Sequence, residues 1–105
     1  MKITVAAALA FTLLPFAASA QSSPEVQRGV MLARTHCVRC HSIDKVSPSP
    51  LTIAPPFREL HKRYKVENLQ EALAEGIVTG HPTMPEFRFD PGQIRDFIAF
   101  LNSLK

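Results

Sequence analysis

The clearest periodic patterns of apolar residues lie in two stretches of the chain, and both predict amphipathic helices. The first begins at Ser23, which is suited to cap a helix, with Pro24 at the first helical position and an acidic residue following. Apolar or small residues then recur every three or four positions, at Val26, Gly29, Val30, Ala33 and Cys37. This spacing brings Cys37 to the buried side of the helix, with Cys40 and His41 about one turn later.

The second clear pattern begins at Asp90. Asp90 is suited to cap a helix, Pro91 takes the first position, and Gln93 completes a D-x-x-Q capping box. An apolar stripe follows at helical spacing, formed by Ile94, Phe97, Ile98, Leu101 and Leu104. The pattern predicts a helix that packs through this stripe.

Between these helices the pattern is weaker. Short helices are expected over about 57–64 and 67–75, and Gly76 stands just past the end of the latter, where glycine often ends a helix. Residues 42–56 and 77–90 are irregular and contain prolines that disfavour helix, so we expect loops there. Without strand-like alternation or internal repeats, the chain is predicted to be an all-α domain of three to four short helices.

Residues 1–20 have a different character. A positively charged start precedes an apolar stretch that Pro15 interrupts, and Ala18-Ser19-Ala20 matches an A-x-A cleavage site. We therefore expect a cleaved secretory signal peptide over 1–20 and a mature domain over 21–105. A membrane anchor is the alternative, but it needs about 20 consecutive apolar residues, so no transmembrane segment is expected in the mature chain.

Composition and charge restrict the function. The 105 residues are 46% hydrophobic and 20% charged, and the formal charge of +3 falls by one unit without Lys2. Because no block of like charges occurs, nucleic-acid binding is not expected. A domain of this size buries only about 60% of its unfolded surface and needs a brace. The two cysteines are too close in sequence to supply it as a disulfide, whereas a large apolar cofactor can.

The two cysteines belong to Cys37-Val38-Arg39-Cys40-His41, the C-x-x-C-H pattern of covalent haem attachment. Each thiol forms a thioether with a haem vinyl group, and the adjacent histidine becomes an axial ligand of the iron. We therefore expect one haem c per chain, attached through Cys37 and Cys40, with His41 on the iron. A thioredoxin-like redox pair would need a preceding strand, and a structural zinc site would need four ligands; both are less favoured.

The second axial ligand must come from elsewhere in the chain. The candidates are Met31, His36, His61, His81 and Met84. The first three are assigned to packing or solvated positions, because the helix leading into the motif or a short exposed helix carries them. Met84 is preferred, since it stands between prolines on a loop far enough downstream of His41 to reach the opposite haem face. Two alternatives remain: His81, which would supply an imidazole ligand, and a position with no protein ligand.

These residues together resemble the class I cytochromes c, which include mitochondrial cytochrome c and many small bacterial periplasmic cytochromes. The resemblance covers nearly all of residues 21–105. Gly29 stands eight residues before the first cysteine, as in the family, and Asp96-Phe97-Ile98-Ala99-Phe100-Leu101 is similar to the family's D-L-I-A-Y-L run. The resemblance implies the cytochrome c fold, in which this glycine lets the first helix cross closely over an aromatic residue, here Phe100.

The resemblance also implies supporting residues. Ala54-Pro55-Pro56-Phe57 is similar to a G-P-x-L segment whose proline carbonyl accepts a hydrogen bond from the haem-ligating histidine. Pro55 is assigned this role, with Pro56 as the rival. The segment from Gly80 to Pro85 resembles the methionine loop of bacterial members. Tyr64 is expected to pack against its own helix rather than to bind a haem propionate, as an aromatic donor does in relatives.

An iron whose two axial positions are filled by His41 and Met84 has no vacancy for a substrate. We therefore expect a monomeric electron carrier of the bacterial periplasm, with no catalytic residues and with unidentified redox proteins as partners. A haem-based gas sensor with a labile Met84 and a haem-free thiol oxidoreductase are the alternatives. Scattered cations at Arg39, Arg58, Lys62, Arg63 and Arg88 either ring an exposed haem edge or simply solvate the surface, and solvation is favoured.

Overall fold

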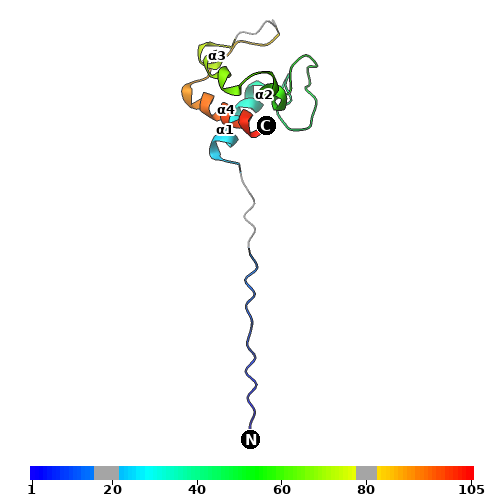
Figure 1. The fold of residues 1–105 in the computed structure, drawn as a ribbon, viewed down its shortest axis with the longest axis vertical. Helices are drawn as coiled ribbons and strands as arrows, with labels where there is room; N and C mark the ends of the chain where they lie inside the picture. The colour runs from blue at the N-terminus through cyan, green and yellow to red at the C-terminus, as the bar shows by residue number, and fades with distance from the viewer. Residues whose placement is uncertain (16–21, 78–82) are drawn as a thin grey trace.

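The structure is a computed structural model that describes residues 1–15, 22–77 and 83–105. Within these residues it contains helices and no strands (Figure 1), so the predicted all-α class is confirmed. In chain order the elements are α1 (Pro24–His36), η1 (Phe57–Glu59), α2 (Leu60–Arg63), η2 (Val66–Asn68), α3 (Leu69–Glu75) and α4 (Pro91–Ser103). The two short helices expected in the middle of the chain each begin with a 3₁₀ turn.

The long helices begin where their capping residues predicted. At α1, the Ser23 hydroxyl accepts a hydrogen bond from the Val26 backbone N–H at 3.3 Å. At α4, the Asp90 side chain accepts from the Gln93 N–H at 2.8 Å, and the Gln93 side chain accepts from the Asp90 N–H at 3.0 Å. This reciprocal pair satisfies two backbone donors that the first turn of a helix leaves without partners.

The helices α1 and α4 pack together at a close crossing. A Cβ atom added to Gly29 would collide with the Asp96 carbonyl oxygen and would lie only 2.6 Å from the Phe100 Cβ atom. Only glycine allows this approach, so the expected crossing of Gly29 over Phe100 is present. Beside it, Arg28 Nε and Nη2 donate to the two Asp96 carboxylate oxygens at 2.9 and 3.1 Å.

The core forms between these two helices and the middle of the chain. Val66 and Leu73, from η2 and α3, are 1% exposed and face the apolar stripe of α4. Phe89, from the segment after Met84, joins the same core. The middle helices and the segment after Met84 thus share one core with α4.

The chain reverses direction after α3. Gly76 has a φ of +106°, which a residue with a side chain rarely adopts, and it turns the chain away from the helix. The Ile77 N–H donates to the Phe87 carbonyl at 3.2 Å, and the Phe89 N–H donates to the Leu73 carbonyl at 2.9 Å. These two bonds attach residues 83–90, which we call the returning segment, to the end of α3.

Residues 1–15 lie outside the helical domain as an extended, fully exposed stretch (Figure 1). The expected cleavage site from Ala18 to Ala20 lies outside the described residues. Among the residues that the structure does describe, none of the helices has the length and apolar character needed to cross a membrane.

Candidate cofactor site

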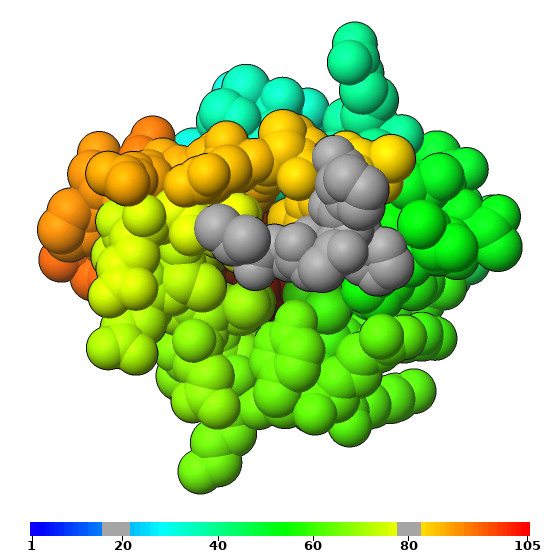
Figure 2. Space-filling model, turned by 90° about the horizontal axis from the view of Figure 1, so that it is seen from above, coloured from blue at the N-terminus to red at the C-terminus, as the bar shows by residue number. Residues whose placement is uncertain are grey.

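A largely apolar cavity of about 270 Å³ opens between the C-terminal end of α1, the loop before η1, and the segment that carries Met84. Its apolar walls include Leu51, Ile53, Leu60, Leu69, Ile77 and Phe97. Figure 2 looks onto this face of the molecule, where the segments around residues 50–77 and 83–90 surround a hollow. The cavity therefore has walls from the end of α1, from η1, α2, α3 and α4, and from the segment around Met84.

The attachment motif follows directly from the end of α1. The Cys37 N–H donates to the Ala33 carbonyl at 2.8 Å, and the His41 N–H donates to the Cys37 carbonyl at 2.9 Å. This extra turn brings Cys37, Cys40 and His41 to the wall of the cavity. The spacing of the motif along the helix predicted this placement.

Both cysteines are free thiols. Cys37 is buried and Cys40 is half-buried. Burial raises the pKa of the Cys37 thiol to about 12, because a thiolate is poorly solvated in an apolar wall. At neutral pH this thiol is protonated in the chain alone.

The His41 imidazole is held by a hydrogen bond to Pro55, the proline favoured over Pro56. His41 Nδ1 lies 2.8 Å from the Pro55 carbonyl oxygen. A carbonyl only accepts hydrogen bonds, so Nδ1 carries the proton and the Nε2 lone pair is free to bind a metal ion. The Phe57 ring lies against the imidazole with a centroid separation of 4.8 Å. The ring of His41 is therefore fixed in both tautomer and orientation.

Met84 is half-buried and lines the same cavity from the returning segment. Of the other candidate ligands, Met31 is 62% exposed on α1 and does not line the cavity, and neither does His61. His36 does line it. His81 lies outside the described residues. The described soft donors that reach the cavity are therefore the two cysteines and Met84.

A chain of aromatic contacts joins His36 and His41, which line the cavity, through three phenylalanines, of which Phe57 and Phe97 also line it and Phe89 lies in the core. It passes from His41 to Phe57, then to Phe97 at 5.8 Å and Phe89 at 5.5 Å, and ends at His36, 5.5 Å from Phe89. Sequence reasoning did not find this chain, because its members come from four separate segments. The only sequence signal was the richness in phenylalanine.

Two polar residues stand at the edge of the cavity. Tyr64 is 41% exposed, and both Tyr64 and Arg63 line the cavity wall. Partial burial raises the pKa of the Tyr64 hydroxyl, and the charge of Arg63 opposes this shift. Tyr64 thus has its apolar ring against the cavity and part of its surface in solvent.

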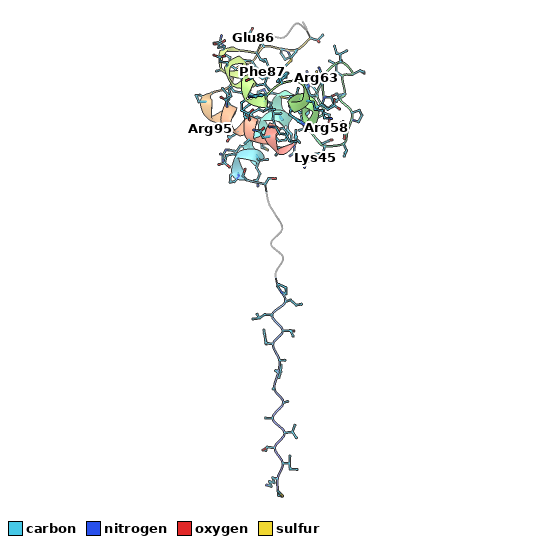
Figure 3. All side chains as sticks on the ribbon, in the orientation of Figure 1. Lys45, Arg58, Arg63, Glu86, Phe87 and Arg95 are labelled. Carbon is cyan, nitrogen blue, oxygen red and sulfur yellow. The ribbon has the colours of Figure 1, made fainter. Side chains whose placement is uncertain are left out.

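Arg58, one of the scattered cations, is engaged within the chain. Its Nη1 donates to the Ser47 carbonyl at 2.7 Å and to the Ser42 hydroxyl at 3.2 Å (Figure 3 labels Arg58). Hydrogen bonds from Ser47 lower the pKa of Asp44 to about 2, and the Val46 N–H adds to this effect. The loop over residues 42–51 is therefore fastened at its base, and Arg58 has a structural role there.

In the part of the chain with described structure, no three His, Cys, Asp or Glu side chains are grouped so as to hold a metal ion by themselves. A zinc site of the kind weighed as an alternative needs such a group. The donor set at the cavity is instead two thiols, one oriented imidazole and one thioether, around an apolar space. This set fits haem, which combines a large apolar ring with an iron that accepts nitrogen and sulfur ligands.

An all-α domain with a C-x-x-C-H segment at the edge of an apolar cavity has the architecture of a c-type haem protein. The family model for cytochrome c matches residues 26–105, and the chain belongs to this family. Members of the family carry covalently bound haem c and are in general electron carriers. Neither the search of curated proteins nor the search of solved structures gave a match.

Proposed function

We propose that this protein is a periplasmic electron carrier with one haem c, attached through Cys37 and Cys40 and ligated by His41 and Met84. The main support is that these four side chains, which come from opposite ends of the domain sequence, line one apolar cavity. Bound haem supplies reversible exchange of one electron between Fe(III) and Fe(II). With His41 and Met84 both bound to the iron, the protein would leave no coordination site for a substrate.

The chain's own residues support this function in three ways. The Pro55 carbonyl holds the His41 proton on Nδ1, which directs Nε2 to the iron and increases the donor strength of the imidazole. Apolar walls exclude water and favour the less charged, reduced state. A thioether ligand from Met84 favours the reduced iron further, so a positive reduction potential is expected.

Visible spectroscopy of the purified protein and of a Met84→Ala variant tests the ligand assignment. The oxidised wild type is expected to show low-spin haem with the weak red charge-transfer band of methionine ligation, and the variant is expected to lose that band. Met31→Ala is the matched control, because Met31 does not line the cavity. If Met84→Ala keeps the band, or the wild type lacks it, the assignment is wrong, and His81→Ala then tests the imidazole alternative.

Carbon monoxide separates the carrier from a gas-binding protein. A carrier with a firmly bound Met84 is expected to bind carbon monoxide only slowly in the reduced state at neutral pH. Rapid, complete binding would favour the gas-sensor alternative. A pyridine haemochrome assay covers the haem-free alternative, because a colourless protein with two free thiols would overturn the proposal.

We assign residues 1–20 to a cleaved signal peptide and the remainder to the periplasm. In support, residues 1–15 present a row of large apolar side chains that are at least 85% exposed, among them Leu9, Phe11 and Leu13. Such a row has no use in a mature water-exposed domain. Intact-mass measurement of the periplasmic fraction is expected to give a chain starting at Gln21 plus one haem; a retained N-terminus would contradict the assignment.

The proposed carrier works as a monomer that exchanges electrons with other redox proteins. Among the described cations, Arg63 lies at the cavity edge, whereas Arg58 is engaged in the loop. Arg63→Ala is therefore expected to weaken the salt dependence of electron exchange with an acidic partner more than the surface control Arg95→Ala. Equal salt dependence in the two variants would count against steering from the cavity edge.

A further inference from the structure

His36 stands directly before Cys37, and the haem-binding role proposed above leaves it without a function. We propose that His36 is a positioning residue, whose ring holds the segment that carries Met84 against the end of the haem-attachment helix. The haem-related part of this inference rests on the proposed function. The contact itself is a property of the folded chain.

The ring of His36 meets two phenylalanines of the returning segment. It is nearly parallel to the Phe87 ring, with an angle of 21° and a centroid separation of 5.9 Å. Its centroid lies 5.5 Å from that of Phe89, at an angle of 59°. Phe87 and Phe89 are themselves 5.3 Å apart. The imidazole therefore packs against two rings that also contact each other.

The opposite side of this segment is already fastened. The Phe87 carbonyl accepts from the Ile77 N–H, and the Phe89 N–H donates to the Leu73 carbonyl. Figure 3 shows Phe87 beside α3, which contains Leu73 and ends two residues before Ile77. The backbone bonds set the distance of the segment from α3, and the His36 stack joins the segment to α1. His36, the last residue of α1, thus links the helix that leads into the cysteines directly to the aromatic pair that follows Met84.

Met84 stands three residues before Phe87, a distance of at most about 10 Å along an extended chain. Over so short a connection, the position of Phe87 limits where the Met84 side chain can lie. His36 is bonded to Cys37, and Phe87 is three residues from Met84, so the stack couples the two sides from which the haem is held. Loss of the ring removes one of the contacts that hold the segment against α1, so the two backbone bonds of the segment open more often.

The competing interpretation is that His36 is a solvated residue at a helix end, since it is exposed overall. That interpretation predicts no effect on Met84 or on the returning segment. An aromatic contact of this kind contributes enough to change an opening equilibrium by about threefold to tenfold. The two interpretations are therefore separable by experiment.

The test compares His36→Ala and His36→Phe with the control Met31→Ala, which removes an exposed side chain from the same helix. In the reduced holoprotein, carbon monoxide binding is limited by release of Met84. We expect His36→Ala to bind it about threefold to tenfold faster than wild type. His36→Phe, which keeps an aromatic ring, and Met31→Ala are expected to stay near the wild-type rate. His36→Gln answers the same question if the alanine variant does not accumulate.

Hydrogen exchange gives a readout that does not depend on haem ligation. The Ile77 amide donates to the Phe87 carbonyl, and the Phe89 amide donates to the Leu73 carbonyl, so both bonds join the returning segment to the end of α3. They are expected to exchange severalfold faster in His36→Ala and to be unchanged in Met31→Ala. If the exchange rates of both amides and the rate of carbon monoxide binding are the same in all variants, the inference is wrong. If the wild type lacks methionine ligation, the ligand proposal fails, and the amides alone then decide whether His36 holds the segment.

Discussion

The close crossing of α1 and α4 leads to a sharp prediction for Gly29→Ala. The added methyl group would overlap the Asp96 carbonyl oxygen and the Phe100 Cβ atom. The first of these is backbone and the second is rigidly attached to it, so neither can rotate away. The two helices must move apart to admit a single methyl group.

The magnitude follows from two opposing effects. Overpacking a well-filled contact costs up to about 3 kcal/mol. Replacing glycine by alanine in the middle of a helix contributes about 1 kcal/mol of stability in the other direction. The net expectation is a loss of about 2 kcal/mol in the free energy of unfolding. For a domain of this size, that corresponds to a fall in Tm of roughly 10 °C.

Gly92→Ala in α4 is the matched control. A Cβ atom there would lie 3.8 Å from Arg95 Nη2 and 3.3 Å from Asp90 Oδ1, the capping oxygen, which must shift by only a few tenths of an ångström and lies at the end of a side chain. This variant is expected to match wild type or to be slightly more stable. Urea and thermal unfolding of the holoproteins, followed by far-UV circular dichroism, measure both variants. A Gly29→Ala protein within about 0.5 kcal/mol of wild type, or equal destabilisation by both changes, would refute the reasoning.

Three further predictions follow from side-chain contacts. The hydrogen bond from Arg28 lowers the pKa of Asp96 in the folded protein. The ionised carboxylate therefore stabilises the fold above about pH 4, and this stabilisation is lost as the pH falls through the lowered pKa. The urea midpoints at pH 3 and pH 7 should therefore differ less in Asp96→Asn than in wild type, and an equal difference in the two proteins would contradict this. Arg58→Ala should release the loop over 42–51 and speed tryptic cleavage after Lys45 severalfold, and equal cleavage rates would exclude the fastening role. Phe57→Ala should lower the free energy of unfolding in urea by about 3 kcal/mol, because the ring is buried against His41. A near-neutral result would contradict this and would mean that neighbouring side chains fill the space left by the ring.

Much of the local structure was predictable because its causes lie within a few residues of each other. The caps at Ser23 and Asp90, the turn at Gly76 and the delivery of Cys37 from the buried side of α1 depend on short-range hydrogen bonds, backbone freedom and helical period. The chemistry of the C-x-x-C-H run is local as well. The family resemblance added the choice of Pro55, and the hydrogen bond from His41 is found there.

The alternatives for the second axial ligand illustrate the limit of that reasoning. Spacing alone favoured Met84 over Met31, and the fold places Met84 at the cavity and Met31 at the surface. Whether His36 faces solvent or the cavity was not predictable, since its position at the end of α1 allows either. The packing of the returning segment decides it.

The sequence by itself thus determined the helices, their ends and the residue types that can bind haem, because each depends on neighbours along the chain. Only the tertiary structure decided that His36 meets Phe87 and Phe89 and that Arg28 pairs with Asp96. It also decided that Arg58 serves the loop rather than the surface. Each of these contacts joins residues from separate elements of the chain, so it depends on how the elements pack; the close crossing at Gly29, for example, brings α1 against α4 beside the Arg28–Asp96 pair.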